Sequence, residues 1–167
     1  MNLPKLIITD VDGVLTDGGM YYDQTGNEWK KFNTADSAGV LLCKKLGIKV
    51  GIITREETEI VRRRSNKLQL DFFVDGCKDK VSAAHKIIKE LNIDFSDVAF
   101  IGDDLGDIAL LKLVGISGTP DNGIPYIKAF ANIITSKSGG EGAFREFVET
   151  IAMRKHSYND LIELIAH

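Results

Sequence analysis

The stretch that decides the fold is Lys5-Leu6-Ile7-Ile8-Thr9-Asp10-Val11-Asp12-Gly13-Val14-Leu15-Thr16, near the start of the chain. Its first part is rich in apolar and β-branched side chains and stops abruptly at Asp10, which is typical of a buried strand that ends in a polar loop. Further along, short apolar runs alternate with helical patterns. Because strands separated by helices form parallel sheets covered on both faces, we predict an α/β fold with a doubly wound parallel sheet.

The expected elements follow one another along the whole chain. Strands are expected at residues 5–9, 48–53, 72–74, 98–101, 115–117 and 132–134. Helices are expected at 35–46, 56–68, 78–91, 107–113, 143–155 and 158–166, with a Pro/Gly turn at 120–123. Aromatic residues on both sides of the turn signal Thr25-Gly26-Asn27 predict a β-hairpin within residues 20–32. We expect one domain over residues 1–167, with a hairpin insert at about 19–32 and a glycine-rich tail with terminal helices at about 139–167.

Composition and charge exclude several classes of protein. A length of 167 residues suits one domain. The 21 Lys and Arg against 24 Asp and Glu give a net charge of -3, which argues against nucleic-acid binding through phosphate neutralisation. The two cysteines, Cys43 and Cys77, lack the spacing of a zinc site, and the apolar run at the N-terminus is too short for a signal peptide or membrane span. We therefore expect a cytoplasmic protein with no nucleic-acid or membrane partner.

Polar side chains stand where several predicted strands end. They are Asp10, Asp12, Thr54, Asp103, Asp104 and Asp107. Because ligands in parallel α/β sheets bind at the carboxyl ends of the strands, these side chains are expected at one edge. At an effective dielectric constant near 20, two carboxylates about 4 Å apart repel by roughly 4 kcal/mol, so a cation is needed. Carboxylate oxygens and water suit magnesium.

The same edge has the groups needed for phosphoryl transfer. Lys80 follows the short strand at 72–74 and can point to this edge. Its ammonium, the Thr54 hydroxyl, a metal ion and backbone N–H groups around residues 11–13 would cradle a phosphoryl group. An aspartate would attack the phosphorus and form an aspartyl-phosphate. A second acid two residues further on would protonate the leaving alkoxide and then deprotonate water.

The motif Asp10-Val11-Asp12-Gly13-Val14-Leu15-Thr16 resembles the signature of the haloacid dehalogenase superfamily, and Thr54, Lys80 and Gly102-Asp103-Asp104-x-x-Asp107 follow in the superfamily's order. The resemblance implies that Asp10 is the nucleophile and Asp12 the general acid and base. It implies that Thr54 and Lys80 bind phosphate. It also implies that Mg²⁺ is held by Asp10, the backbone carbonyl of Asp12 and Asp103, while Asp104 and Asp107 contact metal-bound waters or orient Lys80.

Most members of this superfamily carry a cap domain that selects the substrate, and this chain has no room for one. It is similar to the capless subgroup that includes 3-deoxy-octulosonate 8-phosphate phosphatases. Residues 32–39 and Gly139-Gly140-x-Gly142-Ala143-x-Arg145-Glu146 extend the likeness, which covers the chain to about Ile151. The resemblance implies a homotetramer in which hairpins pack together and a neighbouring subunit acts as the cap.

The chain departs from the octulosonate enzymes at positions expected to face substrate. It reads Thr54-Arg55-Glu56-Glu57 where they usually have Gly-Arg, and Glu141 where they often have Arg. Arg64 and Lys67 are three residues apart and so share a helical face. These features favour 2-keto-3-deoxy-nononate 9-phosphate, a sialic-acid-like ester, with Thr34, Glu56, Arg64 and Lys67 as substrate-binding residues. The eight-carbon ester is the alternative, and a solvated helix face is the alternative for Arg64 and Lys67.

Two non-enzymatic interpretations remain open from the residues alone. A signalling receiver domain also combines Asp, Thr, Lys and magnesium on a doubly wound sheet, but its phosphate-accepting Asp follows a middle strand, where this chain has Thr54. A catalytically dead assembly domain would not need Asp10, Asp12, Lys80 and Asp103. The aromatic residues of the hairpin need burial, which favours contact between subunits.

Overall fold

The computed structural model describes residues 2–166. Its centre is a six-stranded parallel sheet with the strand order β5-β4-β1-β6-β7-β8. The strands are β1 Leu6–Thr9, β4 Lys49–Ile53, β5 Phe72–Val74, β6 Val98–Ile101, β7 Ile116–Thr119 and β8 Ile133–Ile134. The predicted α/β parallel sheet is confirmed.

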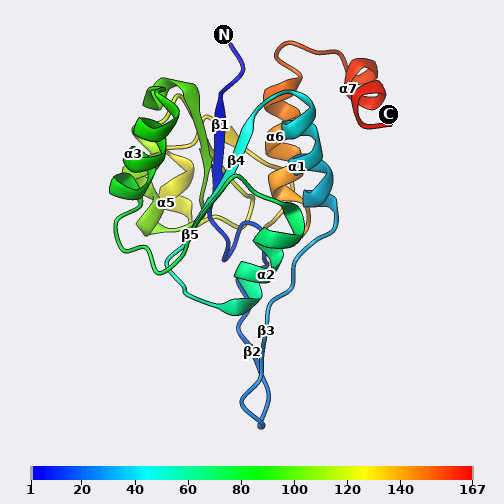
Figure 1. The fold of residues 1–167 in the computed structure, drawn as a ribbon. Coiled ribbons are helices and arrows are strands. Elements are labelled where there is room, and N and C mark those ends of the chain that lie inside the picture. Colours follow the sequence, from blue (N-terminus) through cyan, green and yellow to red (C-terminus); the bar gives the residue numbers. More distant parts are fainter. Residues whose placement is uncertain (1, 167) are drawn as a thin grey trace.

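Seven α-helices are found in the described chain, and six of them cover the two faces of the sheet. They are α1 Ala35–Lys45, α2 Glu59–Leu68, α3 Lys80–Leu91, α4 Ile108–Leu111, α5 Pro125–Lys128, α6 Ala143–Ala152 and α7 Tyr158–Ala166. Two separate apolar clusters join helices to the sheet: α1, α2 and α6 share one cluster, to which α7 adds Leu161, and α3, α4 and α5 share the other. Figure 1 shows α3 and α5 on one side of the sheet and α1 and α6 on the other, with α7 outside them.

Strand β1 shows how the sequence produces the two layers. Successive side chains of a strand point to opposite faces, so Leu6 and Ile8 enter one apolar cluster and Ile7 enters the other. All three are fully buried. A continuous apolar run is what a strand needs when helices cover both of its faces.

The strand order creates a switch point beside β1. The chain moves from β1 to β4 and β5 in one direction, returns to β6 on the other side of β1, and continues to β7 and β8. Neighbouring connections therefore diverge between β1 and β6, where a crevice opens at the carboxyl ends of the strands. Asp10 follows β1 and Asp103 follows β6, so both sit at this crevice.

A β-hairpin projects from the same edge of the sheet (Figure 1). It consists of β2 Tyr21–Tyr22 and β3 Glu28–Trp29, and an antiparallel bridge between Thr16 and Phe32 closes its root. Within residues 2–166 this hairpin is the whole insertion between β1 and α1, so the prediction of a hairpin insert without a cap domain is confirmed. Its aromatic side chains are exposed, with Tyr22 at 65% and Trp29 at 52%.

Several predicted boundaries were wrong because local capping decides where helices begin. Helix α2 starts at Glu59 instead of Glu56, since the Thr58 hydroxyl accepts a hydrogen bond from the Val61 N–H. The helix expected at 107–113 is a 3₁₀ turn, Leu105–Asp107, followed by the short α4. A further 3₁₀ turn at Phe95–Asp97 was not predicted.

The segment after β6 differs most from the prediction. The strand expected at 115–117 runs from Ile116 to Thr119, and the described strand β8 lacks Asn132. Helix α5 was not predicted, although Pro125 occupies its first turn, where a missing N–H costs nothing. The expected helix at 143–155 ends at Ala152. These differences move element ends without changing the order of strands and helices.

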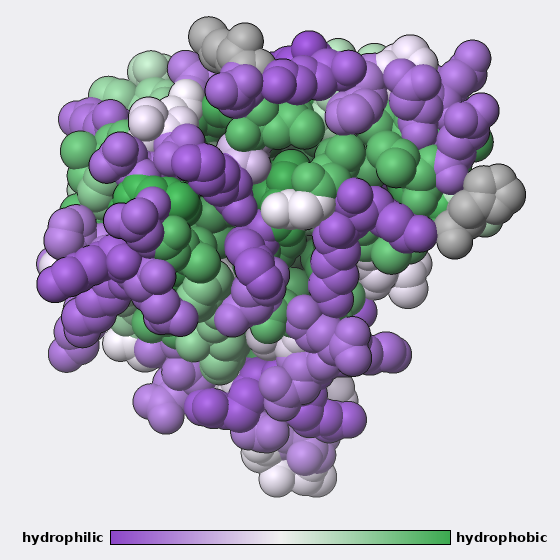
Figure 2. All heavy atoms as spheres, turned by 45° about the horizontal axis from the view of Figure 1, so that its top comes forward, coloured by the Kyte–Doolittle hydropathy of each residue, from purple (hydrophilic) through white to green (hydrophobic). Residues whose placement is uncertain are grey.

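The surface carries both hydrophilic and hydrophobic side chains. Figure 2 shows hydrophobic side chains in patches between hydrophilic ones on the face that it draws.

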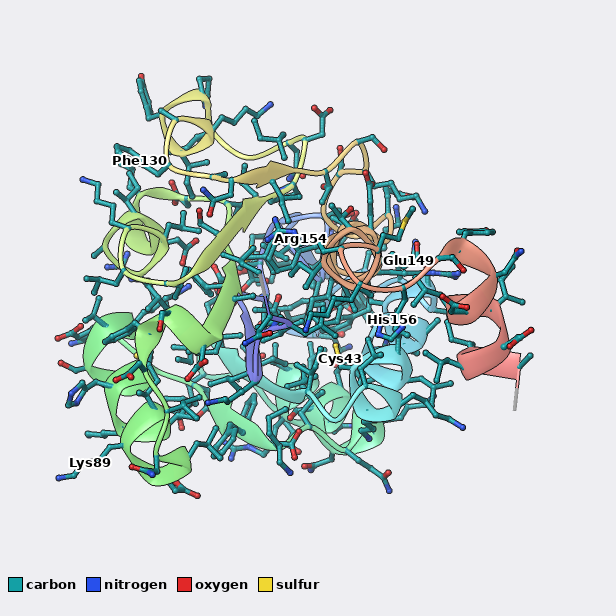
Figure 3. All side chains as sticks on the ribbon, turned by 90° about the horizontal axis from the view of Figure 1, so that it is seen from above. Cys43, Lys89, Phe130, Glu149, Arg154 and His156 are labelled. Atoms are coloured by element: carbon teal, nitrogen blue, oxygen red, sulfur yellow. The ribbon has the colours of Figure 1, made fainter. Side chains whose placement is uncertain are left out.

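In the view from above, Lys89 points outward from α3, whereas Cys43 lies inside, toward the sheet (Figure 3). Cys43 is fully buried and unpaired. In the described chain no helix is both long and apolar enough to span a membrane.

Candidate active site

Asp10 is held at the end of β1 by the neighbouring strand. Its N–H donates to the carbonyl of Ile101 over 3.0 Å, which ties the loop after β1 to the end of β6. The loop then turns tightly, because the carbonyl of Val11 accepts hydrogen bonds from the N–H groups of Val14, Leu15 and Thr16. Asp10 is 8% exposed, so the strand end places a nearly buried carboxylate in the crevice.

Gly13 lets this loop lie against the loop after β6. Its φ of +84° is in the left-handed region, and a Cβ atom there would lie 1.9 Å from Oδ2 of Asp103. A side chain at this position would therefore be strained and would displace Asp103. The glycine after the second aspartate is thus required by the close approach of the two acidic loops.

Lys80 connects two carboxylates at the bottom of the crevice. Its Nζ lies 2.9 Å from Oδ2 of Asp10 and 2.6 Å from Oδ1 of Asp107. Burial alone would lower the pKa of this lysine, but the two carboxylates outweigh burial and raise it. Lys80 is therefore a permanent cation inside the site, and it occupies the first position of α3, after the cap Asp79.

Three carboxylates crowd together beside Lys80. Oxygen atoms of Asp10, Asp103 and Asp107 all lie within 4.8 Å of one another. Burial, together with repulsion from its acidic neighbours, raises the pKa of Asp103 to about 8. Burial raises the pKa of Asp10 to about 7, although Lys80 opposes this shift. Both raised pKa values reflect the cost of burying charged carboxylates side by side, a cost that a divalent cation would offset.

Asp107 already has protein partners for both of its oxygens. Oδ1 accepts from Lys80, and Oδ2 accepts from the N–H groups of Asp103 and Asp104 over 3.0 and 3.2 Å. Its geometry therefore suits the predicted orientation of Lys80. The Asp104 side chain instead caps the following 3₁₀ turn through the N–H of Leu105, over 2.7 Å.

A cleft of about 400 Å³ surrounds these groups. It is lined by Asp10, Asp12, Gly13, Gly18, Thr54, Arg55, Glu56, Lys80, Asp103, Asp104, Gly106 and Asp107. Eight predicted site residues are thus brought together: Asp10, Asp12, Thr54, Glu56, Lys80, Asp103, Asp104 and Asp107. Six acidic residues line this cleft against two basic ones, an excess that favours a bound cation.

The other predicted substrate residues lie elsewhere. Arg64 and Lys67 line a second hollow of about 340 Å³ with Phe32, Ile60 and Arg63. The Arg64 guanidinium donates to the carbonyl of Asn33 and to the Ser37 hydroxyl, over 3.0 and 3.2 Å. Thr34 is exposed at the N-cap position of α1 and lines neither hollow. The structure therefore does not bring these three side chains into the cleft of their own chain.

Sequence reasoning missed Lys30, a hairpin residue that contacts two of the acids lining the cleft. Its Nζ donates to Oδ1 of Asp12 over 2.6 Å and to Oε2 of Glu56 over 2.5 Å. The side chain is 1% exposed, whereas that of the adjacent Lys31 is 50% exposed. Strand alternation signals that the two lysines point to opposite sides, but it does not say which side faces the site.

Comparisons with known proteins agree with this geometry. The haloacid dehalogenase-like hydrolase family matches residues 52–146. The 3-deoxy-D-manno-octulosonate 8-phosphate phosphatase of Haemophilus influenzae is 34% identical over 147 residues, which cover 88% of this chain and 82% of that protein. The chain belongs to the haloacid dehalogenase-like hydrolases. This membership confirms the predicted superfamily and excludes the receiver-domain alternative.

Solved structures of haloacid dehalogenase-like hydrolases superpose closely on this fold. The 3-deoxy-D-manno-octulosonate 8-phosphate phosphatase of Moraxella catarrhalis, solved with a magnesium ion, a phosphate ion and a KDO molecule, has a TM-score of 0.91 and 36% identity, covering 96% of this chain and 92% of that one. The cobalt-bound enzyme of Haemophilus influenzae has a TM-score of 0.85 and 33% identity, covering 90% and 88%. The predicted class of enzyme, a hydrolase of this family, is confirmed, and these two relatives are phosphatases solved with magnesium and with cobalt.

Proposed function

We propose that this chain is a magnesium-dependent phosphatase that hydrolyses a phosphorylated 2-keto-3-deoxy sugar acid through an aspartyl-phosphate. The observation that carries the proposal is the position of Asp10, whose nearly buried carboxylate lies 2.9 Å from Lys80 at the switch point between β1 and β6. A nucleophile in a crevice at the strand ends, beside a fixed cation, suits attack on a phosphate ester.

The residues present fit a magnesium ion. Oδ1 of Asp103 is buried and has no hydrogen-bond partner among residues 2–166, which is costly unless a cation meets it. Asp10, Asp103 and the backbone carbonyl of Asp12 would hold the ion, with waters completing its shell. When bound, magnesium neutralises the carboxylates and polarises the phosphoryl oxygens.

The protein groups would divide the two chemical steps between them. A carboxylate oxygen of Asp10 attacks phosphorus, and the bond from phosphorus to the sugar oxygen breaks while Asp12 gives that oxygen a proton. Asp12 then takes a proton from water, the water oxygen attacks phosphorus, and the Asp10 carboxylate is released with inorganic phosphate. Lys80 and the Thr54 hydroxyl bind the non-bridging oxygens throughout.

We propose 2-keto-3-deoxy-nononate 9-phosphate as the substrate. Support comes from Glu56, which lines the cleft at a position where the chain departs from the octulosonate enzymes. Its carboxylate suits a sugar hydroxyl more distant from the phosphate. The eight-carbon 3-deoxy-octulosonate 8-phosphate is the second candidate, because relatives that carry its name are 33–36% identical to this chain.

We also propose a single domain that assembles as a cytoplasmic homotetramer, in which a neighbouring subunit closes the cleft and in which neither nucleic acid nor membrane is a partner. The exposed aromatic residues of the hairpin support the assembly, since isolated hairpins are marginally stable in water. Thr34, Arg64 and Lys67 lie outside the cleft of their own chain, so in this assembly they would contact the substrate of a neighbouring subunit.

The experiment that tests the function is steady-state kinetics with Mg²⁺ on the eight- and nine-carbon sugar-acid phosphates side by side. We expect turnover of both esters and a higher kcat/KM for the nine-carbon ester. A preference for the eight-carbon ester would replace the first candidate by the second. Failure to hydrolyse either ester would reject the sugar-acid substrate class.

A further inference from the structure

The hairpin places one buried cation behind the wall of the catalytic cleft. The Lys30 side chain is 1% exposed, and its ammonium contacts Oδ1 of Asp12 at 2.6 Å and Oε2 of Glu56 at 2.5 Å. The Asp12 and Glu56 side chains are themselves 30% and 39% exposed, so they lie at the wall of the cleft and Lys30 lies behind them. A buried lysine with two carboxylate partners is held more firmly than a surface ion pair.

The root of the hairpin fixes where Lys30 enters. The bridge between Thr16 and Phe32 joins the strand that leaves the first loop to the strand that returns from the hairpin, and Lys30 lies two residues before that bridge. The Thr16 hydroxyl also contacts Oδ1 of Asp12, over 3.3 Å. The same short segment of paired backbone therefore positions both the Thr16 hydroxyl and the Lys30 ammonium, which donate hydrogen bonds to Asp12.

The contacts distinguish the two oxygens of Asp12. Oδ1 receives both Lys30 and Thr16. Among residues 2–166 no hydrogen bond to Oδ2 is found, and the Asp12 side chain reaches the cleft. Oδ2 is therefore the oxygen available to exchange a proton with the leaving group and then with water.

We infer that Lys30 is a positioning residue for the general acid: it fixes Oδ1 of Asp12 so that Oδ2 faces the substrate, and it is itself anchored by Glu56. This inference rests on the proposed phosphatase function. It gives the hairpin a part in catalysis within its own subunit, since the insert carries the side chain that orients Asp12. Glu56 thereby acts on the acid through Lys30 in addition to any contact with the sugar.

The test uses two leaving groups that need the acid to different degrees. An alkyl ester, such as the sugar-acid phosphate, needs a proton on its departing oxygen, whereas p-nitrophenyl phosphate releases a weakly basic phenolate without one. The parameter kcat/KM reports only steps up to formation of the aspartyl-phosphate, so the second use of Asp12 does not enter. We expect K30M to lower kcat/KM by at least about tenfold for the alkyl ester and by less than about threefold for the aryl ester.

The matched control is K31M, which removes the same charge from the next position, where Lys31 pairs with Glu141 outside the cleft. It should leave the ratio of the two kcat/KM values within about twofold of wild type. If K30M does not fold, as judged by its melting curve, K30R replaces it and should show an intermediate, alkyl-selective loss, because a guanidinium keeps the charge but changes the geometry.

Equal losses on both esters, or no loss on either, would overturn the role of Lys30. Activity assays of the wild-type enzyme test the proposed function separately. If it hydrolyses neither sugar-acid ester but accepts glycerol phosphate, the substrate class fails, and glycerol phosphate serves as the alkyl ester for the Lys30 comparison.

Discussion

The two sides of the cleft are built differently. On the strand side, Asp10, Lys80 and Asp107 are 8%, 5% and 1% exposed and are fixed by the ends of β1 and β6 and the start of α3. On the hairpin side, Glu56 and Asp12 are partly exposed and are held through one lysine of an insert. The difference teaches that sheet topology fixes the side chains proposed for phosphoryl chemistry, whereas an insert and loops hold those proposed to adapt it to a substrate.

Removal of the proposed nucleophile on the strand side should abolish turnover. Asp10→Asn keeps the shape of the side chain but cannot form an acyl-phosphate, so turnover should fall by more than about 10³-fold on every ester. The melting temperature should be retained, because Asn also removes a charge from a crowded acidic cluster. Rapid-quench and steady-state assays measure the loss. The control is Asp97→Asn, which removes a charge from the exposed ion pair between Lys5 and Asp97. Most of the activity remaining would reject Asp10 as nucleophile.

Changes at Glu56 on the hairpin side, and at Lys67 on the α2 face proposed to act across a subunit boundary, should alter substrate choice more than chemistry. We expect Glu56→Gln and Lys67→Met each to lower the ratio of kcat/KM for the nine-carbon over the eight-carbon ester by about tenfold, the effect of about 1.4 kcal/mol of lost differential binding. General phosphatase activity on p-nitrophenyl phosphate should fall less. Arg62→Met, on the same helix in an exposed pair with Asp75, is the control. Uniform losses on all three esters would contradict a role in specificity.

The smallest effect concerns stability without metal. The pKa of Asp103 is about 8 in the folded protein against the ordinary 3.8, so the folded state binds the proton more tightly. Stability therefore falls as pH rises from about 4 to 8, because the unfolded state releases that proton first. In EDTA, Asp103→Asn should remove this penalty and raise the melting temperature at pH 8.5 by at least about 2–4 °C, with little gain near pH 4.

In the same experiment, added magnesium should make the melting temperature of wild type higher than that of Asp103→Asn. The ion is expected to stabilise wild type by binding its folded state, and the variant lacks one of the proposed carboxylate ligands. Differential scanning calorimetry with and without Mg²⁺ measures both effects. A gain in melting temperature that does not depend on pH would show that Asp103 carries no burial penalty from its charge.

The strand side could be predicted from the sequence because its signals are local. A buried apolar strand followed by Asp10, and another followed by Asp103, locate these acids at strand ends, and parallel topology brings strand ends together. The predicted convergence of Asp10, Thr54, Lys80 and Asp103 in one cleft agrees with the structure. Their roles in catalysis stay predictions.

The hairpin side could not be predicted in the same way, because its contacts depend on long-range geometry. Lys30 meets Asp12 across 18 positions and Glu56 across 26, and no periodic pattern indicates which of two adjacent lysines turns inward. Arg64 and Lys67 do share a helical face, as predicted, but that face lines a separate hollow. The short α5 was missed because four residues carry too little periodicity.

The central claim, that Asp10 accepts the phosphoryl group, is tested most directly by a crystal structure of the wild-type enzyme with Mg²⁺ and beryllium fluoride, which mimics an acyl-phosphate. We predict beryllium at bonding distance from a carboxylate oxygen of Asp10, with fluorines against Lys80 and Thr54. Beryllium bound to any other side chain, or fluoride seated in the cleft without a bond to Asp10, would contradict the claim.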